Sequence, residues 1–339
     1  MQLNEIWFLI VGFLFIGYFV LDGFDFGVGM SLPFLGKDDT DRRVLINTIG
    51  PVWDLNETWV LVAGASLFAA FPEWYASLFS GFYLPLLLIL AALIARGVAF
   101  EYRGKGKTIG ADEVRWKATF DWMIVVGSAL PALLWGVAFA NIVQGVPLNE
   151  QHIYTGTLFT LLNPYGLLGG LVTLTLFWTH GLMFIALKTE GDIKDRASKL
   201  GTKVGIATTV LAATFLVWTL IARFSVLGFI LSALAAVSLI AGLVANYFKR
   251  EGIAFSLLVV TIITAVGSLF AALFPNVFPS TTDAAFSLTI ENASSSQYTL
   301  TVMTWVAVFM IPLILLYQGW TYWVFRKRIS RNSIPAGSH

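Results

Sequence analysis

The fold of this chain is decided by the stretch Ile49-Gly50-Pro51-Val52-Trp53-Asp54-Leu55-Asn56-Glu57-Thr58-Trp59, which opens an apolar segment that continues to Phe71. As an α-helix, residues 51–71 would span roughly 31 Å, which matches the hydrocarbon core of a bilayer. Proline suits the first helical position, where its missing N–H breaks no hydrogen bond. Two carboxylates nevertheless fall in the first two turns, and their spacing puts Asp54 and Glu57 on one helix face. Ionisable groups inside a membrane helix are costly, so we interpret this pair as a functional site.

The amino-acid composition is that of a membrane protein. Hydrophobic residues make up 57% of the chain, charged residues only 12%, and the mean hydropathy is +0.78. A soluble domain has about 25% charged residues. The net charge of +1 gives no indication of nucleic-acid binding, and we expect none. The absence of cysteine excludes disulfides, thiolate metal sites and cysteine nucleophiles.

Nine segments are long and apolar enough to be membrane-spanning helices. They are residues 6–30, 51–71, 75–99, 118–141, 161–187, 204–222, 226–247, 253–274 and 300–325. Long runs in lipid must satisfy their backbone polar groups internally, which leaves the helix as the only reasonable form. The predicted fold class is therefore all-α: a polytopic integral membrane protein with nine transmembrane helices.

The basic residues orient these helices. With nine spans, 20 of the 21 Lys and Arg residues fall on one side of the membrane and only Arg223 on the other. Because cytoplasmic loops are enriched in Lys and Arg, we expect the N-terminus outside and the C-terminus in the cytoplasm. The same topology brings polar residues of four helices into the cytoplasmic half of the membrane. They are Asp22 and Asp25, Asp54 and Glu57, Arg96, and Asp121.

Asp54 and Glu57 have two interpretations. Intramembrane acids recur in proton relays, and the deeper Glu57 is then the better proton carrier. The alternative is a structural pair, held by Arg96 or by backbone donors, that keeps the helices in register. Arg96 itself is interpreted as the charge that neutralises these acids rather than as a substrate-binding group.

Asp22 and Asp25 lie near the membrane interface among several glycines. One interpretation is a helix end whose acids pair with Arg42 or Arg43. The other is a proton entrance or a cation site.

Histidine is too scarce for a protein that holds several haems. The chain has only His152, His180 and His339, and none is expected at the middle of the membrane. Haem iron usually takes His, Cys, Met or Tyr. We therefore expect no cofactor and no metal ion to be bound by this chain itself, and no phosphate-binding loop, zinc helix or nucleophile triad is present in the sequence.

Several motifs, in matching order over about residues 6–326, resemble those of subunit II of the cytochrome bd quinol oxidases. They are Asp22-Gly23-Phe24-Asp25-Phe26-Gly27-Val28-Gly29, Gly50-Pro51-Val52-Trp53-Asp54, Leu67-Phe68-Ala69-Ala70-Phe71-Pro72, Phe79-Ser80-Gly81-Phe82-Tyr83, Gly136-Val137-Ala138-Phe139, Leu162-Asn163-Pro164-Tyr165-Gly166-Leu167 and Val302-Met303-Thr304-Trp305. The resemblance implies two four-helix bundles plus one peripheral helix. We then expect one membrane domain over residues 1–330, with the first bundle in about 1–145, the second in about 155–275 and the last helix in about 299–326. Residues 331–339 would be a tail and a candidate cloning remnant.

The resemblance also implies a function. Such a subunit pairs with a subunit I that carries haem b, haem d and the quinol site, and the complex reduces O₂ to water with protons taken from the cytoplasm. In the family the Trp-Asp pair lines a proton path, and the matching residues are Trp53 and Asp54. Leu55 stands where the motif commonly has Gly, so the chain departs from the family pattern directly beside Asp54.

We therefore expect a subunit of a respiratory terminal oxidase in the bacterial cell membrane. It would scaffold subunit I and conduct protons through Asp54, Glu57, Trp53, Asp25 and Asp22, with Arg96 as their charge partner. Small accessory subunits, quinone and lipids are further expected partners. The alternatives are a proton-coupled secondary transporter and a purely structural scaffold. Transporter sites lie near the middle of the membrane, so the position of these acids in its inner half argues against a transporter.

Overall fold

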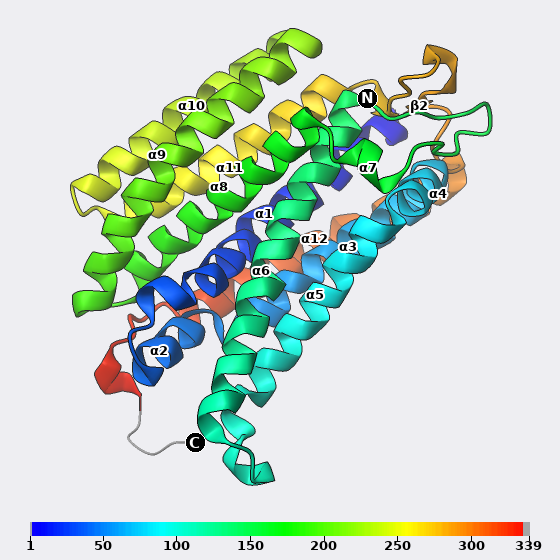
Figure 1. Cartoon of the computed structure of the whole chain (residues 1–339). Helices are drawn as coiled ribbons and strands as arrows, with labels where there is room; N and C mark the ends of the chain where they lie inside the picture. Colours follow the sequence, from blue (N-terminus) through cyan, green and yellow to red (C-terminus); the bar gives the residue numbers. More distant parts are fainter. Residues whose placement is uncertain (1, 335–339) are drawn as a thin grey trace.

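The structure is a computed structural model that describes residues 2–334 and is mostly helical. In this part of the chain eight helices are long and apolar enough to cross a membrane. They are α1 (Leu3–Leu35), α5 (Tyr83–Tyr102), α6 (Glu113–Gln144), α8 (Pro164–Lys188), α9 (Gly191–Ala222), α10 (Val226–Tyr247), α11 (Glu251–Leu273) and α12 (Gln297–Val324). The predicted all-α, polytopic class is confirmed, and the long helices run side by side in Figure 1.

The predicted span 51–71 forms the helix α3 (Trp53–Ala70), which is not among these eight helices. Its first two turns contain Asp54, Asn56 and Glu57, and these polar residues lower the mean hydropathy of a helix of only 18 residues. The helix also begins later than expected, because Pro51 lies in the preceding turn. The count of nine spans therefore stays a prediction.

Other boundaries of the prediction were wrong. The expected helix 75–99 is interrupted at the buried Phe82, which separates α4 (Pro72–Gly81) from α5. Pro72 begins α4, and Pro85 falls in the first turn of α5, where a missing N–H is tolerated. The expected helix 204–222 begins 13 residues earlier, because its polar first turns extend beyond the apolar run.

The connecting segments contain short elements that the sequence analysis missed. The amphipathic helix α2 (Asp39–Ile49) lies between α1 and α3, and Asp38 caps it by accepting a hydrogen bond from the backbone N of Asp41 at 2.8 Å. The smaller elements are α7 (Leu158–Leu161), the antiparallel strands β1 (Asn276–Phe278) and β2 (Leu288–Thr289), and the 3₁₀ turns η1 (Arg103–Lys105), η2 (Lys107–Ile109), η3 (Ala284–Phe286) and η4 (Arg331–Ser333).

Helix α1 is the centre of the fold. It packs against α3, α6, α8 and α11, whereas α12 contacts little besides α1 and α3 and is mostly exposed (Figure 1). The contact with α8 is close enough to require glycine on both sides. A Cβ atom on Gly27 would lie 2.7 Å from the Cα atom of Gly181. Small residues that let two backbones approach are typical of helix contacts in membranes.

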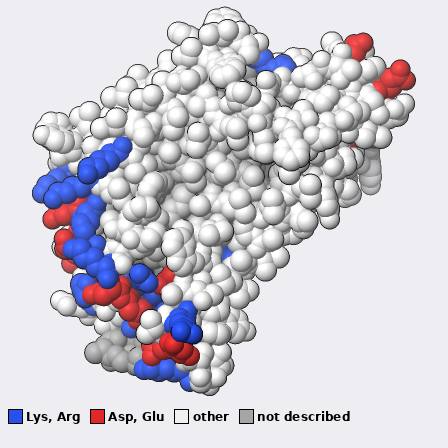
Figure 2. Space-filling model, viewed as in Figure 1, with Lys and Arg blue, Asp and Glu red and all other residues white. Residues whose placement is uncertain are grey.

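Charged side chains gather at one end of the molecule, which we call the charged end. It comprises α2, the α5–α6 connection, the start of α9, the α10–α11 turn and the residues after α12. Figure 2 shows Lys, Arg, Asp and Glu concentrated there, an apolar middle zone and a few charges at the opposite end. That opposite end carries the start of α1 together with α4, β1 and β2 (Figure 1).

Candidate functional site

A buried arginine joins acids from two other helices in the half of the bundle nearer the charged end. Arg96 of α5 has no exposed surface, and its Nη2 lies 2.5 Å from Oδ1 of Asp22 on α1 and 3.0 Å from Oε2 of Glu57 on α3. The guanidinium also lies over the ring of Phe26, 4.4 Å from its centroid. The Asp22 side chain is completely buried, and that of Glu57 is 22% exposed.

Asn56 connects this arginine site to a third acid. Its Nδ2 donates to Oδ2 of Asp25 at 2.8 Å and to the carbonyl oxygen of Leu21 at 3.3 Å. Its Oδ1 accepts hydrogen bonds from Gln318 Nε2 at 2.9 Å and from the Tyr322 hydroxyl at 2.8 Å, both on α12. The side chain thus uses its whole hydrogen-bonding capacity to join α1, α3 and α12. We call Asp22, Asp25, Asn56, Glu57 and Arg96 the Arg96 cluster.

The cluster is not fully satisfied. Among the described residues, Oδ2 of Asp22 and Oδ1 of Asp25 have no hydrogen-bond partner, and neither do Nε and Nη1 of Arg96. Buried polar atoms normally find a partner in the protein or in ordered water. The two carboxylate oxygens and the two guanidinium nitrogens are therefore free to form hydrogen bonds with water.

The two residues of the Trp-Asp pair lie apart from the cluster. Asp54 is exposed and forms no ion pair within the described chain. Trp53 is half-buried and packs on Phe100 with ring centroids 5.1 Å apart. Although a spacing of three makes Asp54 and Glu57 neighbours on the surface of α3, only Glu57 contacts Arg96, and Asp54 is exposed.

Of the two interpretations of Asp22 and Asp25, the pairing with Arg42 does not occur: Asp22 pairs with Arg96, and Asp25 accepts from Asn56. Arg42 of α2 instead donates to Oδ2 of Asp121 at 2.8 Å, and Arg103 donates to Oδ1 of the same carboxylate at 2.6 Å. Asp121 therefore belongs to a separate network at the charged end, although the sequence analysis placed it in the same layer as the other acids.

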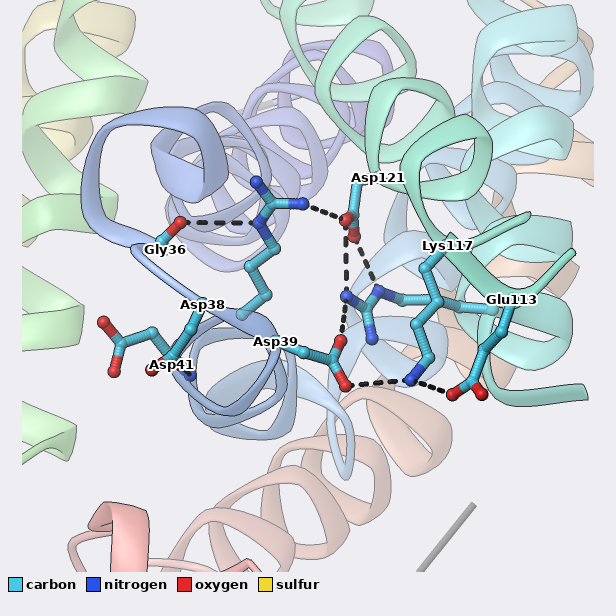
Figure 3. A network of polar contacts seen from close by, with 9 residues as sticks. Gly36, Asp38, Asp39, Asp41, Glu113, Lys117 and Asp121 are labelled. Atoms are coloured by element: carbon cyan, nitrogen blue, oxygen red, sulfur yellow. Dashed lines mark hydrogen bonds and ion pairs between the residues drawn. The ribbon is translucent and has the colours of Figure 1, made fainter. Parts of the chain in front are cut away.

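Figure 3 shows this network, in which Asp39 and Asp121 are joined through Arg103. Asp39 accepts from Arg103 Nη2 at 2.8 Å and from Lys117 Nζ at 2.9 Å. Partial burial raises the pKa of Asp39, but the hydrogen bonds from Lys117 and Arg103 outweigh that effect and hold the pKa below its usual value. The network ties α2 to the α5–α6 connection.

The residues after α12 are bound to the same end. Arg331 donates to Oδ1 of Asp41 at 2.5 Å and to Oδ2 of Asp38 at 2.7 Å, and Lys188 donates to the carbonyl oxygens of Phe325 and Lys327. The pKa of Asp38 is lowered by its helix-capping hydrogen bond and by Arg331. Of the predicted tail 331–339, residues 335–339 lie outside the described residues.

The histidines within the described chain are engaged in packing contacts. His180 is buried, stacks on Phe255 with centroids 4.7 Å apart and has Nε2 3.1 Å from the carbonyl oxygen of Val20. His152 bonds the carbonyl oxygen of Phe286 at 2.8 Å. No group of three His, Cys, Asp or Glu residues arranged for a metal ion occurs in residues 2–334.

Sequence reasoning missed three members of the polar region. Asn56 was quoted only as part of a motif, and Gln318 and Tyr322, which both donate to Asn56, were not identified. A usable signal existed, because an amide in the middle of an apolar helix needs a buried partner. Which helix supplies that partner depends on packing and could not be known from the sequence.

Fold and site together define a polytopic helical membrane protein with a buried arginine–carboxylate site near its charged end. Comparison with known proteins gives the family. The family model for cytochrome bd terminal oxidase subunit II matches residues 3–325. Cytochrome bd ubiquinol oxidase subunit 2 of Bacillus subtilis is 41% identical, with 97% of each chain covered, and cytochrome bd-I ubiquinol oxidase subunit 2 of Escherichia coli K12 is 38% identical, with 99% of this chain and 98% of the relative covered.

The chain therefore belongs to the family of cytochrome bd terminal oxidase subunit II, and the resemblance found in the sequence is confirmed. It is a subunit of an oxidoreductase and a multi-pass protein of the bacterial cell membrane. A solved structure of bd oxidase from Geobacillus thermodenitrificans has the same fold, with a TM-score of 0.78 at 15% identity over 96% of this chain and all of the other.

Proposed function

We propose that this chain is the subunit that scaffolds a haem-bearing subunit I and conducts protons toward the oxygen-reducing haem of a quinol oxidase. In this proposal haem b, haem d and the quinol site belong to subunit I. Small accessory subunits, quinone and lipids are further partners of the complex. The full-length relatives, which are named as ubiquinol oxidase subunits, support the reaction class.

We further propose nine spans, with α3 as the ninth, arranged as two four-helix bundles and one peripheral helix. In support, α3 packs along α1 and contacts α12. Helices α1, α3, α5 and α6 would form the first bundle, within residues 1–145, and α8 to α11 the second, within 155–275. The concentration of Lys and Arg at the charged end supports a cytoplasmic position for that end, with the N-terminus outside (Figure 2).

The proposed proton path begins at Asp54 and continues to Glu57, Asp22 and Asp25. Three observations support this order. Asp54 is exposed at the start of α3, Glu57 is partly exposed one turn further in, and Asp22 and Asp25 are completely buried behind it. Trp53 would line the beginning of the path beside Asp54. Leu55 adds a side chain where the family motif commonly has none.

The observation that carries the proposal is the imbalance of charge in the Arg96 cluster. The cluster contains one guanidinium and three carboxylates, of which Asp22 and Asp25 are fully buried. An uncompensated charge is costly in an apolar environment, so the cluster is expected to hold one or two protons rather than two surplus negative charges. A buried group of acids that shares a variable number of protons is suited to pass them on.

A kinetic experiment on the assembled oxidase tests this function. Glu57→Gln and Asp25→Asn should each slow proton uptake, followed with a pH indicator after fully reduced complex is mixed with O₂, by ten-fold or more, while haem absorbance stays that of the parent. Glu73→Gln, an exposed acid on α4 at the opposite end, is the matched control and should change nothing. Unchanged proton uptake in both cluster variants would refute the relay.

A purely structural role is the second candidate, because Arg96 pairs with acids of two different helices and could serve only to hold them together. The same variants separate the two functions. A scaffold role predicts less complex and a lower thermal midpoint, with normal turnover per haem. The transporter alternative is set aside because the chain belongs to the oxidase family.

A further inference from the structure

The turn between α10 and α11 contains two neighbouring cations that no acid of the described chain neutralises. Most basic residues of the charged end pair with acids, as in the networks of Asp39, Asp41 and Asp121. Lys249 and Arg250, in the turn between α10 and α11, are exposed and form no ion pair with any acid in residues 2–334. Figure 2 shows basic side chains along this edge of the molecule.

The adjacent acid is turned away from them. Glu251 directly follows Arg250, yet its Oε1 lies 2.7 Å from Lys194 Nζ and its Oε2 3.6 Å from Arg328 Nη2. The carboxylate of Glu251 is thus paired with cations of α9 and of the segment after α12. The positive charge of the α10–α11 turn is left for a ligand from outside the chain.

A groove between α10 and α11 begins at this turn. Arg250 lines one end of it, and the remaining lining is aliphatic or aromatic. The main lining side chains are Val237, Ile240, Val244, Phe248, Ile253 and Leu257. Five of these are about half exposed or more, so the groove opens on the side of the helices that faces away from the bundle.

The charge and the shape of the groove indicate which kind of molecule it binds. An apolar channel along two membrane helices matches an acyl chain, and cations at its end, at the depth of the membrane surface, match a phosphate headgroup. Tyr247 and Phe248 are exposed beside them, as is typical of aromatic residues at the membrane interface. An anionic phospholipid uses both features at once, because its phosphate pairs with the cations and its acyl chain fills the apolar groove.

We propose that the groove between α10 and α11 is a binding site for an anionic phospholipid, whose phosphate contacts Lys249 and Arg250 and whose acyl chain lies along Val244 and Leu257. The lipid comes from the leaflet at the charged end. It fills the outer side of the α10–α11 pair, which is remote from the Arg96 cluster on α1, α3 and α5.

Binding of phosphatidylglycerol to the purified oxidase complex, counted by native mass spectrometry during a titration, tests the site. Each basic residue at a membrane surface strengthens anionic-lipid binding about 5-fold, so the variant Lys249→Gln/Arg250→Gln should bind about 30-fold more weakly. The charge-matched control Arg115→Gln/Lys327→Gln changes two exposed cations of the same end outside the groove and should bind like the parent. Haem absorbance and O₂ consumption verify that all variants are assembled.

Two further measurements make the test specific. Val244→Trp fills the groove but keeps both cations, and it should also lower the number of bound lipids. Phosphatidylcholine, as the zwitterionic probe, should bind the parent far more weakly than phosphatidylglycerol. Equal affinity of the parent for both lipids, unchanged phosphatidylglycerol binding by the double variant, or a protein rather than a lipid captured by a photo-crosslinker at residue 244 would each overturn the proposal.

Discussion

Replacement of Arg96 by Gln is the perturbation for which the structure gives the clearest expectation. The guanidinium has no exposed surface and contacts Asp22 and Glu57 at 2.5 and 3.0 Å. Glutamine keeps part of the volume and the polarity but removes the charge. Within residues 2–334, the carboxylates of Asp22 and Glu57 then lose the only cation that contacts them.

The size of the effect follows from the burial of the pair. Removing one partner of a buried ion pair costs about 3–5 kcal/mol, because the remaining charge stays desolvated and uncompensated. For a cooperative unit of 150–250 residues, each kcal/mol lowers Tm by about 2–4 °C, and by less in a larger unit. Arg96→Gln should therefore lower the thermal midpoint of the complex, which is larger than such a unit, by less than about 20 °C, measured as the loss of haem absorbance on heating.

A second variant shows whether charge is the cause. Asp22→Asn in the Arg96→Gln background removes the fully buried carboxylate, and it should recover more than half of the lost stability. If Arg96→Gln unfolded at the parental temperature, or if Asp22→Asn made it still less stable, the interpretation of Arg96 as the neutralising charge of the cluster would be wrong.

Two further predictions concern the hydrogen bonds around the site. Asn56→Leu removes four hydrogen bonds and leaves the Tyr322 and Gln318 donors of α12 unsatisfied, so it should cost about 3 kcal/mol and loosen α12, detected as faster proteolysis of the segment after α12. Asp39→Asn should cost at most about 1 kcal/mol at pH 7, because this salt bridge is partly exposed. Since the folded pKa of Asp39 is lowered, its contribution is complete above the unfolded pKa of about 3.9 and is lost as pH falls through the folded value. The stability difference between parent and Asp39→Asn should therefore be constant from pH 5 to 8, and a difference that grew toward pH 5 would contradict the assigned ion pairs.

The long helices could be predicted from the sequence because apolar length is a property of the chain itself. The predicted helix 226–247 agrees with α10 to the residue, and the other long helices differ from their predictions mainly at the ends. The break at Phe82 and the helix α2 could not be predicted in this way. Both depend on polar or aromatic residues whose surroundings exist only in the folded molecule.

The candidate site was predictable as a set of residues but not as a set of pairs. The count of Lys and Arg placed Asp22, Glu57 and Arg96 in one layer of the membrane, and the structure brings them into contact. Rotation of each helix about its axis then decides which groups meet. The sequence does not specify that rotation, so it left open whether Asp22 and Asp25 pair with Arg42 or Arg43, and in the structure Arg42 pairs with Asp121.

The polar residues at the start of α3 explain why α1, α5 and α12 all contact this part of the helix. A helix with Asn56 and Glu57 in its first two turns is poorly suited to enter a bilayer alone. Each of these side chains is satisfied by a different helix, Glu57 by α5 and Asn56 by α1 and α12. The position of α3 thus depends on three neighbours at once, and the same amide is one of the contacts that join α12, which has few buried residues, to the rest of the fold. The residues of the proposed relay are therefore also those that join α1, α3, α5 and α12, so a variant that slows proton uptake must be compared with one that only weakens assembly.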